Sequence, residues 1–362
     1  MSTDLQDIFL QLLRLGIGLG DNAEIQRLSV KDWQELVGMA NEQGLLGVML
    51  DGMEKLPRDL RPEKKAIIQS IGQVIHSEQK YSVQENAAKE MALLLHQHGI
   101  RTYVLKGAVV AECYPKPEHR RSVDMDCFLL SEEGSTDVWE NANCLMERQG
   151  FKVRRDYYKN STIVLPGLSV ENHRYFTPFR GNKRLHRLER LLQDEMLRMK
   201  GATIDSNFEG TYLYRPPVMV SALFLIEHAY SHFLHEGLTW RIVLDWMMFS
   251  RKHQDEIDWN ALNAGVAEFG LDRFYGSYYR LGRYLLGEIT FDVLELSDKL
   301  MLNDIWAPLD VHETVRGLRG KLALAENTWR ARWKYRHFTD MTWLRALWIQ
   351  AKGVMFENNP SI

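Results

Sequence analysis

The sequence is poor in cysteine, and its three cysteines, Cys113, Cys127 and Cys144, lie far apart. It contains no Cys-x-x-Cys pair, so neither a disulfide framework nor a zinc knuckle is predicted. No uncharged apolar stretch reaches about 18 residues, and the N-terminus lacks a basic segment followed by a long apolar run. We therefore expect a cytoplasmic protein that does not insert into a membrane.

An excess of charge of one sign is lacking as well. The chain has 45 Lys and Arg against 48 Asp and Glu, and its net charge of −3 provides no general attraction to nucleic acid or anionic lipid. Repeats and low-complexity tracts are absent, so the parts of the chain are expected to pack as one body. With 45% hydrophobic residues in a chain of 362, the composition is typical of a globular protein with an ample core.

The first part of the chain, residues 4–98, has helical periodicity throughout. The spacing of apolar residues predicts helices over 4–15, over 30–39 with Ser29 as the N-cap, and over 63–98. The last of these ends at a glycine and carries two histidines in its final turn, where they suit the negative end of the helix dipole.

Strand signals are concentrated in residues 100 to about 180. Proline and glycine punctuate this region, and they separate short apolar runs from two helical segments. The predicted elements are a buried strand ending at Lys106-Gly107, a helix over 108–114, a strand over 123–130, a helix over 135–149, and strands over 151–157, 162–165 and 168–176.

Two carboxylates stand near the start of the strand over 123–130. Side chains of a strand alternate between its faces, so Asp124 and Asp126 share one face, while Met125 and Cys127 share the other. Two like charges held this close repel each other, and a divalent cation between them would remove the repulsion. Oxygen ligands of this kind suit Mg²⁺. The alternative is a solvated strand end at which one of the two aspartates caps a turn.

Several segments around these aspartates resemble a known family. The segments Leu105-Lys106-Gly107-Ala108, Tyr114-Pro115 and Arg121-Ser122-Val123-Asp124-Met125-Asp126 resemble the core of the nucleotidyltransferase superfamily, which has the polymerase-β-like fold. More narrowly, they resemble an uncharacterised bacterial nucleotidyltransferase family with Leu-Lys-Gly in place of the usual Gly-Ser. The segment Asp32-Trp33-x-x-Leu36-x-x-x-Ala40 resembles the N-terminal helices of the same family.

The resemblance implies a site. The glycine turn would hold a nucleoside triphosphate such as ATP, and the Asp-x-Asp pair would bind two Mg²⁺ ions together with a third acid from a neighbouring strand. Two departures leave the nucleotide and acceptor preference open. Ala108 stands where a serine hydroxyl normally meets a phosphate, and the interval from Gly107 to Asp124 is longer than usual.

Glu171 is the candidate for the third acid. It shares a strand face with His173, and the segment Ser-Val-Glu-Asn-His matches the acid-x-His pattern of the family. Asp156 is the alternative third acid, and Glu171 would then be an exposed charge on an edge strand. The expected catalytic and metal-binding residues are therefore Asp124, Asp126 and Glu171.

Four further residues are the expected nucleotide-binding set: Lys106, Gly107, Arg121 and His173. Glycine lets backbone amides approach phosphates closely, and the cations Lys106 and Arg121 are suited to neutralising a leaving pyrophosphate. Arg120 is a weaker candidate for the same role. The alternative for Lys106 is an exposed position at the end of its strand.

The last half of the chain is expected to be helical. Pro216-Pro217 begins a helix over 218–233 that carries His228 and His232, with His235 shortly after. His-x-x-x-His spacing raises the possibility of zinc, but the residue after His228 is an alanine, so the acid of a metalloprotease motif is missing.

The stretch over 228–246 resembles a helical motif that lies across the cleft from the core in the family. It provides His232, Arg241 and Asp245 as candidates for substrate contact. Arg241 and Asp245 are one helical turn apart, so the alternative is a structural ion pair between them.

Two basic segments have a plain structural alternative. Residues 174–190 could form a patch for an acidic partner, but a solvated helix face opposite a leucine stripe explains them more simply. A segment near the end alternates arginines with Trp329, Trp333, Trp343 and Trp348. It could bind a membrane surface or a partner, and packing onto the helical region is the simpler expectation.

The sequence thus predicts an α+β protein with a small mixed β-sheet nucleotidyltransferase core over 99–180, an N-terminal helical region over 1–98 and a C-terminal helical domain over 181–362. The expected function is Mg²⁺-dependent transfer of a nucleoside monophosphate from an NTP to an unidentified acceptor, which could be a small hydroxyl compound, a protein side chain or an RNA end. The alternatives are another phosphate-transfer reaction on the same core, or a catalytically decayed core that acts as a binding or antitoxin-like module.

Overall fold

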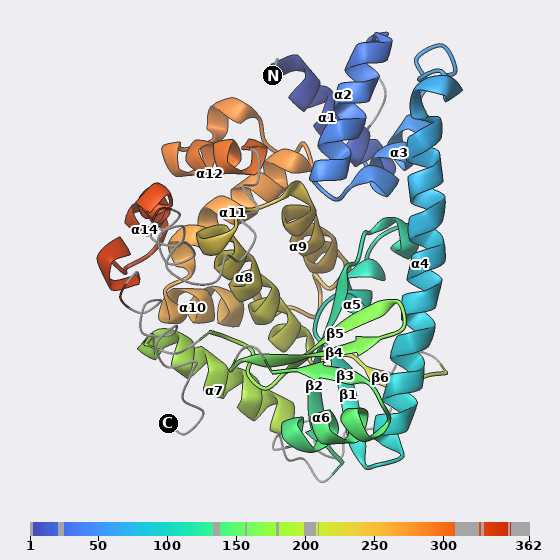
Figure 1. Cartoon of the computed structure of the whole chain (residues 1–362). Coiled ribbons are helices and arrows are strands. Elements are labelled where there is room, and N and C mark those ends of the chain that lie inside the picture. Colours follow the sequence, from blue (N-terminus) through green and yellow to red (C-terminus); the bar gives the residue numbers. More distant parts are fainter. Residues whose placement is uncertain are drawn as a thin grey trace.

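The protein consists of a helical body with a β-sheet at one end (Figure 1). The computed structural model describes residues 3–20, 25–132, 138–155, 158–178, 181–198, 208, 210–307, 326, 329–346 and 348. The expected α+β class, a mixed sheet flanked by helices from both ends of the chain, is confirmed. Asp156 lies outside the described residues, so its place as an alternative third acid stays a prediction.

Four helices form the N-terminal region: α1 (Thr3–Gly16), α2 (Val30–Glu42), α3 (Leu46–Lys55) and α4 (Lys64–His96). The predicted N-cap is confirmed, because the Ser29 side chain accepts a hydrogen bond from the Asp32 backbone N–H and Asp32 completes a capping box. Helices α1 and α3 pack closely at Gly52, where a Cβ would lie 2.0 Å from the carbonyl oxygen of Leu12. Helix α4 runs along one side of the molecule, from α3 down to the sheet (Figure 1).

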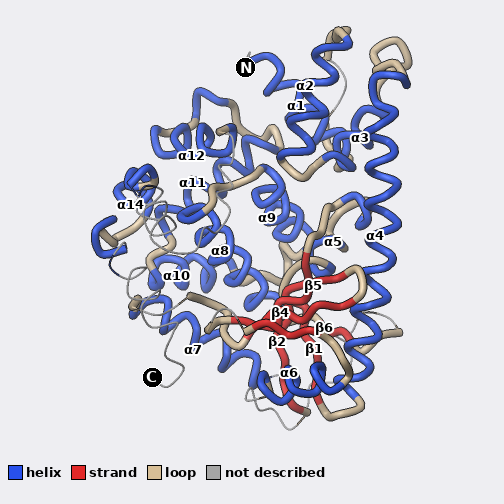
Figure 2. Tube along the Cα trace, in the orientation of Figure 1, coloured by secondary structure: helices blue, strands red, loops and turns tan. Residues whose placement is uncertain are grey.

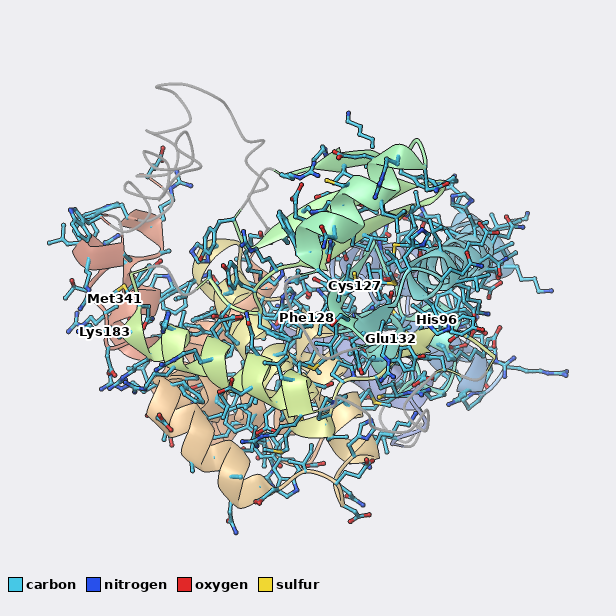
Figure 3. All side chains as sticks on the ribbon, turned by 90° about the horizontal axis from the view of Figure 1, so that it is seen from below. His96, Cys127, Phe128, Glu132, Lys183 and Met341 are labelled. Atoms are coloured by element: carbon cyan, nitrogen blue, oxygen red, sulfur yellow. The ribbon has the colours of Figure 1, made fainter. Side chains whose placement is uncertain are left out.

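The sheet has six strands in the order β3-β4-β5-β2-β1-β6. Their bounds are β1 (Ile100–Val104), β2 (Asp124–Ser131), β3 (Lys152–Arg154), β4 (Asn160–Leu165), β5 (Leu168–His173) and β6 (Leu213–Tyr214). Strand β2 is central, antiparallel to β1 and parallel to β5. Its interior positions are buried, and Cys127 and Phe128 lie inside the molecule (Figure 3). This central position places the two aspartates of β2 at the junction of the sheet with the helices.

Some elements differ from the sequence-based expectations. The helix after Gly107 is a single turn, α5 (Ala108–Ala111), and a 3₁₀ turn, η1 (Pro117–His119), follows it. Helix α6 spans Trp139–Arg148. Strand β6 was not expected, because it comes from the part of the chain assigned to the helical domain. It pairs in parallel with β1 over only two residues, which is too short for a period-two pattern to be recognised.

The remaining helices form a body beside the sheet (Figure 2). They are α7 (Lys183–Arg198), α8 (Val218–His235), α9 (Trp240–Lys252), α10 (Trp259–Phe269), α11 (Asp272–Leu285), η3 (Phe291–Val293), α12 (Leu296–Trp306) and α14 (Arg332–Phe338). Most of α8 is buried, and α9 buries Trp240 and Trp246. Among the described residues, none of the helices is long and apolar enough to cross a membrane.

Contacts at the ends of the helices explain several charged residues. His96, in the last turn of α4, lies beside Glu132 (Figure 3), with its Nδ1 3.4 Å from the carboxylate. On α7, Arg184 pairs with Asp340, and Arg187 pairs with Glu268 at 3.3 Å. Leu185, Leu188 and Leu192 are buried on the other side of α7, so this part of the basic segment is an exposed helix face opposite leucines, as its simpler alternative predicted.

The tryptophan-bearing segment is only partly packed. Trp333 contacts Phe233 of α8 edge to face, with ring centroids 5.8 Å apart. Lys334 is buried and donates hydrogen bonds to the Phe233 carbonyl and to Asp304. Trp329 and Trp348 are exposed. The segment is thus attached to the helical body by α14, as its simpler alternative predicted.

Candidate active site

Two neighbouring parallel strands bring acids to one face of the sheet. Asp126 of β2 is the register partner of Glu171 of β5, and Phe128 is the partner of His173. Because side chains two apart share a face, Asp126, Glu171 and His173 converge. Asp126 and His173 are buried, whereas the Glu171 side chain is 36% exposed. The period-two prediction for Glu171 and His173 therefore agrees with their geometry.

These three residues form a cluster that could hold a metal ion. One ligand atom from each lies within 4.8 Å of the other two. Nε2 of His173 is 3.0 Å from Oδ1 of Asp126, and Asn160 donates a hydrogen bond of 2.9 Å to Glu171. Oδ2 of Asp126 is buried and has no hydrogen-bond partner. A buried carboxylate oxygen without a hydrogen-bond donor keeps its lone pairs unused, so this atom suits metal ligation.

Asp124 lies in the same pocket but outside this cluster. It begins β2 and is only partly buried. Burial, and then the nearby charge of Asp126, raise the pKa of Asp124. Asp124 therefore holds its proton more strongly than Asp126 does, and the two aspartates of the motif are not equivalent.

Lys106 connects the acids to α8. Its Nζ lies 3.6 Å from Oδ2 of Asp126 and 2.7 Å from Nε2 of His228. Burial alone would raise the pKa of Asp126, but Lys106 and His173 outweigh it and hold this pKa well below its usual range. Burial and Lys106 also push the pKa of His228 far down, so His228 is neutral and accepts the hydrogen bond from the ammonium.

The turn after β1 contains a glycine in a backbone conformation that other residues rarely adopt. Gly107 has φ of +79°, in the left-handed region that favours glycine, and it precedes α5. The side chain of Ser122 donates a hydrogen bond to the Asp124 carbonyl close to this turn. Gly107 thus lies in the turn between β1 and α5. Its contact with phosphates stays a prediction.

The two arginines before β2 have different surroundings. Arg121 is exposed and lines a second cavity of about 310 Å³ between α2, α4 and η1. Arg120 is buried, lines the pocket of the acids, and donates hydrogen bonds of 3.0 and 2.7 Å to the two carboxylate oxygens of Asp245. Arg120 therefore borders the pocket of the acids and Arg121 does not, while the nucleotide-binding role expected of Arg121 stays a prediction.

Helices α8 and α9 provide the wall opposite the sheet. Asp245 is buried, and it accepts a hydrogen bond of 2.8 Å from the Tyr114 hydroxyl in addition to those from Arg120. Arg241 lines the pocket and is 3.4 Å from Asp245. His232 also lines the pocket, with its Nδ1 2.9 Å from Glu236. Asp245 thus has the surroundings of a structural residue, whereas Arg241 and His232 face the pocket.

The three histidines of α8 do not converge as a metal site. His228 is bonded to Lys106, His232 to Glu236, and Nδ1 of His235 is 2.7 Å from the Ser231 carbonyl. Within the described part of the chain, the group with metal-ligand geometry is that of Asp126, Glu171 and His173. Zinc at the His-x-x-x-His spacing therefore has no support in the geometry.

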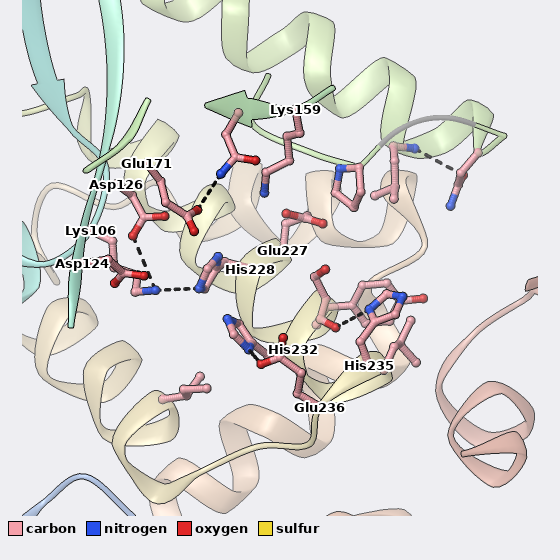
Figure 4. Close-up of a pocket in the computed structure, with 18 of the residues that line it drawn as sticks. Lys106, Asp124, Asp126, Lys159, Glu171, Glu227, His228, His232, His235 and Glu236 are labelled. Carbon is pink, nitrogen blue, oxygen red and sulfur yellow. Dashed lines mark hydrogen bonds and ion pairs between the residues drawn. The ribbon is translucent and has the colours of Figure 1, made fainter. Parts of the chain in front are cut away.

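The pocket between the sheet and α8 has a volume of about 810 Å³ and is shown in Figure 4. Its lining includes residues that sequence reasoning missed, above all Lys159, Asn160 and Glu227. One signal for Glu227 was available, since it is the single charged residue in the run Val-Met-Val-Ser-Ala-Leu-Phe-Leu-Ile-Glu. A volume of this size is typical of sites for small molecules and cofactors.

Comparison with protein families gives one match. Residues 29–287 match the model of a family described as uncharacterised nucleotidyltransferase, and this range contains the sheet, α8 and α9. Searches of curated proteins and of solved structures found no match. Since the match covers well over half of the 362 residues, the chain belongs to this uncharacterised nucleotidyltransferase family.

Proposed function

We propose that the protein transfers a nucleoside monophosphate from an NTP to an acceptor hydroxyl, with Mg²⁺ bound at the acids of β2 and β5. The observation that carries the proposal is the buried Oδ2 of Asp126, which has no hydrogen-bond partner and faces an 810 Å³ pocket next to Glu171 and His173. Membership in a nucleotidyltransferase family supports the general reaction.

The residues present fit a divalent cation. Asp126 and Glu171 would hold one Mg²⁺, and Asp124 would share a second ion with them and with the triphosphate. His173 either joins the first ion or orients Asp126 through its hydrogen bond of 3.0 Å. When bound, Mg²⁺ supplies charge neutralisation at the phosphates and lowers the pKa of the attacking hydroxyl.

The reaction is an in-line displacement at the α-phosphorus. The acceptor oxygen forms a bond to this phosphorus, and the bond from it to the oxygen bridging to the β-phosphate breaks. The bridging oxygen keeps the electron pair and leaves with pyrophosphate, while the hydroxyl proton passes to solvent. Catalysis of such transfers rests on positioning and on charge stabilisation.

The chain's own residues have distinct roles in this proposal. Lys106 neutralises negative charge beside Asp126, and the neutral His228 holds the ammonium in place. Gly107 allows the turn after β1 to approach the triphosphate. Arg241 faces the same pocket and is available to a phosphate, because its pairing with Asp245 is long. Arg120 pairs with Asp245, so Asp245 does not depend on Arg241 for its charge partner.

The test is calorimetric titration of the full chain with each of the four NTPs, with and without Mg²⁺. Wild type is expected to bind at least one NTP only when Mg²⁺ is present, and Asp126→Asn is expected to lose that binding. Asp194→Asn makes the same change at an exposed site on α7 and should bind like wild type. Equally weak binding by wild type and Asp126→Asn would overturn the proposal.

Transfer itself separates the enzyme from its alternative. With α-labelled NTP, the enzyme is expected to move label onto a small hydroxyl compound, a protein side chain or an RNA end. Mg²⁺-dependent binding without any transfer would favour the decayed core that acts as a binding or antitoxin-like module.

A further inference from the structure

Glu227 of α8 is a buried acid without a partner in the wall of the pocket. The residue is 1% exposed, and neither of its carboxylate oxygens has a hydrogen-bond partner. It lines the same cavity as Asp126 and Glu171, and Figure 4 shows it on the α8 side of that cavity. The unused carboxylate is therefore almost fully buried, and it borders the cavity.

The surroundings of Glu227 leave its charge uncompensated. Burial raises its pKa to about 7, and the positive charge of Lys159 opposes this shift. Lys159 lines the pocket too, but no ion pair joins these two described residues. The nearby Glu189 accepts hydrogen bonds from Thr177 and Gln193, so it is already satisfied. A buried carboxylate with no donor is strongly unfavourable, and the site is complete only when a donor or cation binds.

We propose that Glu227 binds an ammonium group of the acceptor, so that the acceptor is a hydroxyl compound that also carries a primary amine. The proposal rests on the proposed function and names the substrate class of that same site. An ammonium matches Glu227 in charge and offers three donors to its two oxygens.

The triphosphate fits Glu227 less well than a cation does, because its charge has the same sign as that of the ionised carboxylate. A neutral hydroxyl would supply a hydrogen bond but would leave the buried charge unpaired. A nucleobase amino group is likewise neutral, so it would also leave the charge unpaired. If Glu227 did contact the nucleobase, its substitution would change NTP affinity. The acceptor's ammonium is the ligand group that resolves both the missing hydrogen bonds and the missing charge.

The experiment uses a matched pair of probes, glucosamine and glucose, which differ in one amino group. Each is titrated into the full chain with Mg²⁺ and a non-hydrolysable ATP, GTP, CTP or UTP analogue, and affinity is measured by calorimetry. Wild type is expected to bind glucosamine about tenfold or more tightly than glucose. Equal affinity for the two sugars, including no binding of either, would overturn the proposal.

Two variants locate the effect. Glu227→Gln keeps the shape and removes the charge, so it should abolish the preference for glucosamine while leaving NTP-analogue affinity unchanged. Glu256→Gln makes the same change at an exposed, histidine-paired acid and should keep the preference. If Glu227→Gln retains the preference, or instead weakens NTP-analogue binding, the assignment of Glu227 to the acceptor is wrong.

The analogue titration separates this inference from the proposed function. Failure of wild type to bind any NTP analogue counts against the nucleotidyltransferase proposal. Normal analogue binding without a preference for the amine counts against the acceptor class alone. Folding of Glu227→Gln is checked by its thermal midpoint, which is expected to be equal to or above that of wild type because an unpaired buried charge has been removed.

Discussion

Nζ of Lys106, just after β1, lies 2.7 Å from Nε2 of His228 on α8, so one hydrogen bond joins the two walls of the pocket. The same ammonium lies 3.6 Å from Oδ2 of Asp126. Lys106 thus occupies the position of a charge partner for the acid that we propose as a metal ligand.

The substitution Lys106→Met should make stability depend on the cation. Without Mg²⁺ we expect it to destabilise the protein by about 1–3 kcal/mol, because Asp126 loses the ammonium paired with it. Added Mg²⁺ should then raise the thermal midpoint more in Lys106→Met than in wild type. Lys89→Met removes an exposed ion pair with Glu85 and should change stability by less than about 1 kcal/mol. An equal Mg²⁺ effect in wild type and Lys106→Met would contradict this expectation.

The acids of the pocket should contribute unequally to cation binding. Asp126 and Glu171 belong to the cluster within 4.8 Å, whereas Asp124 does not. In the absence of nucleotide, Asp126→Asn and Glu171→Gln are each expected to weaken Mn²⁺ binding about tenfold or more, and Asp124→Asn is expected to weaken it less. Electron paramagnetic resonance of free Mn²⁺ measures this order. A larger effect from Asp124→Asn than from the other two would show that the cluster is not the first site to fill.

The buried pair of Arg120 and Asp245 should be a main structural element of the pocket. Arg120→Met leaves the Asp245 carboxylate without its bidentate partner, and we expect a loss of about 3–5 kcal/mol in urea denaturation. Tyr114→Phe removes one hydrogen bond to Asp245, with an expected loss of about 1 kcal/mol.

The matched control for this pair is Arg251→Met, which removes an exposed contact of 3.3 Å with Glu288 and should change stability by less than about 1 kcal/mol. If Arg120→Met were as mild as this control, Asp245 would not depend on the pair.

His119 should make stability depend on pH. Burial lowers its pKa, but hydrogen bonds to Asp51 of α3 and Glu78 of α4 outweigh this effect, so the pKa is raised in the folded protein. The imidazolium therefore stabilises the fold fully below its unfolded pKa of about 6.5, and this contribution is lost as the pH rises through the raised value.

The measurement is the free energy of unfolding between pH 5.5 and pH 9. Wild type should lose stability over this range relative to His119→Gln, which cannot take up the proton. Parallel curves for the two proteins would mean that His119 is not charged between the two acids.

The sequence was most informative where the geometry is local. Alternation along a strand predicted that Glu171 and His173 share a face, and likewise Asp124 and Asp126, because this period holds for any strand. The register that sets Asp126 opposite Glu171 could only be expected from the family resemblance. It depends on pairing between strands that are far apart in the chain.

Contacts between the sheet and the helices were not predictable in the same way. Nothing in the segment around Lys106 indicates that it will meet His228, because that contact is set by how α8 packs on the sheet. For the same reason nothing in the sequence distinguishes Arg120, which lines the pocket of the acids, from Arg121, which lines only the second cavity. Glu227 carried a local signal, a lone charge in an apolar helix, but its lack of a partner depends on the tertiary structure.

Strand β6 has a consequence for work with fragments. It contributes Leu213–Tyr214 to the open side of β1, although the other five strands come from residues 100–173. A polypeptide truncated at residue 180 would leave the backbone N–H and C=O groups of β1 without these partners. Unpaired strand edges associate with other chains, so such a truncation is expected to aggregate on expression.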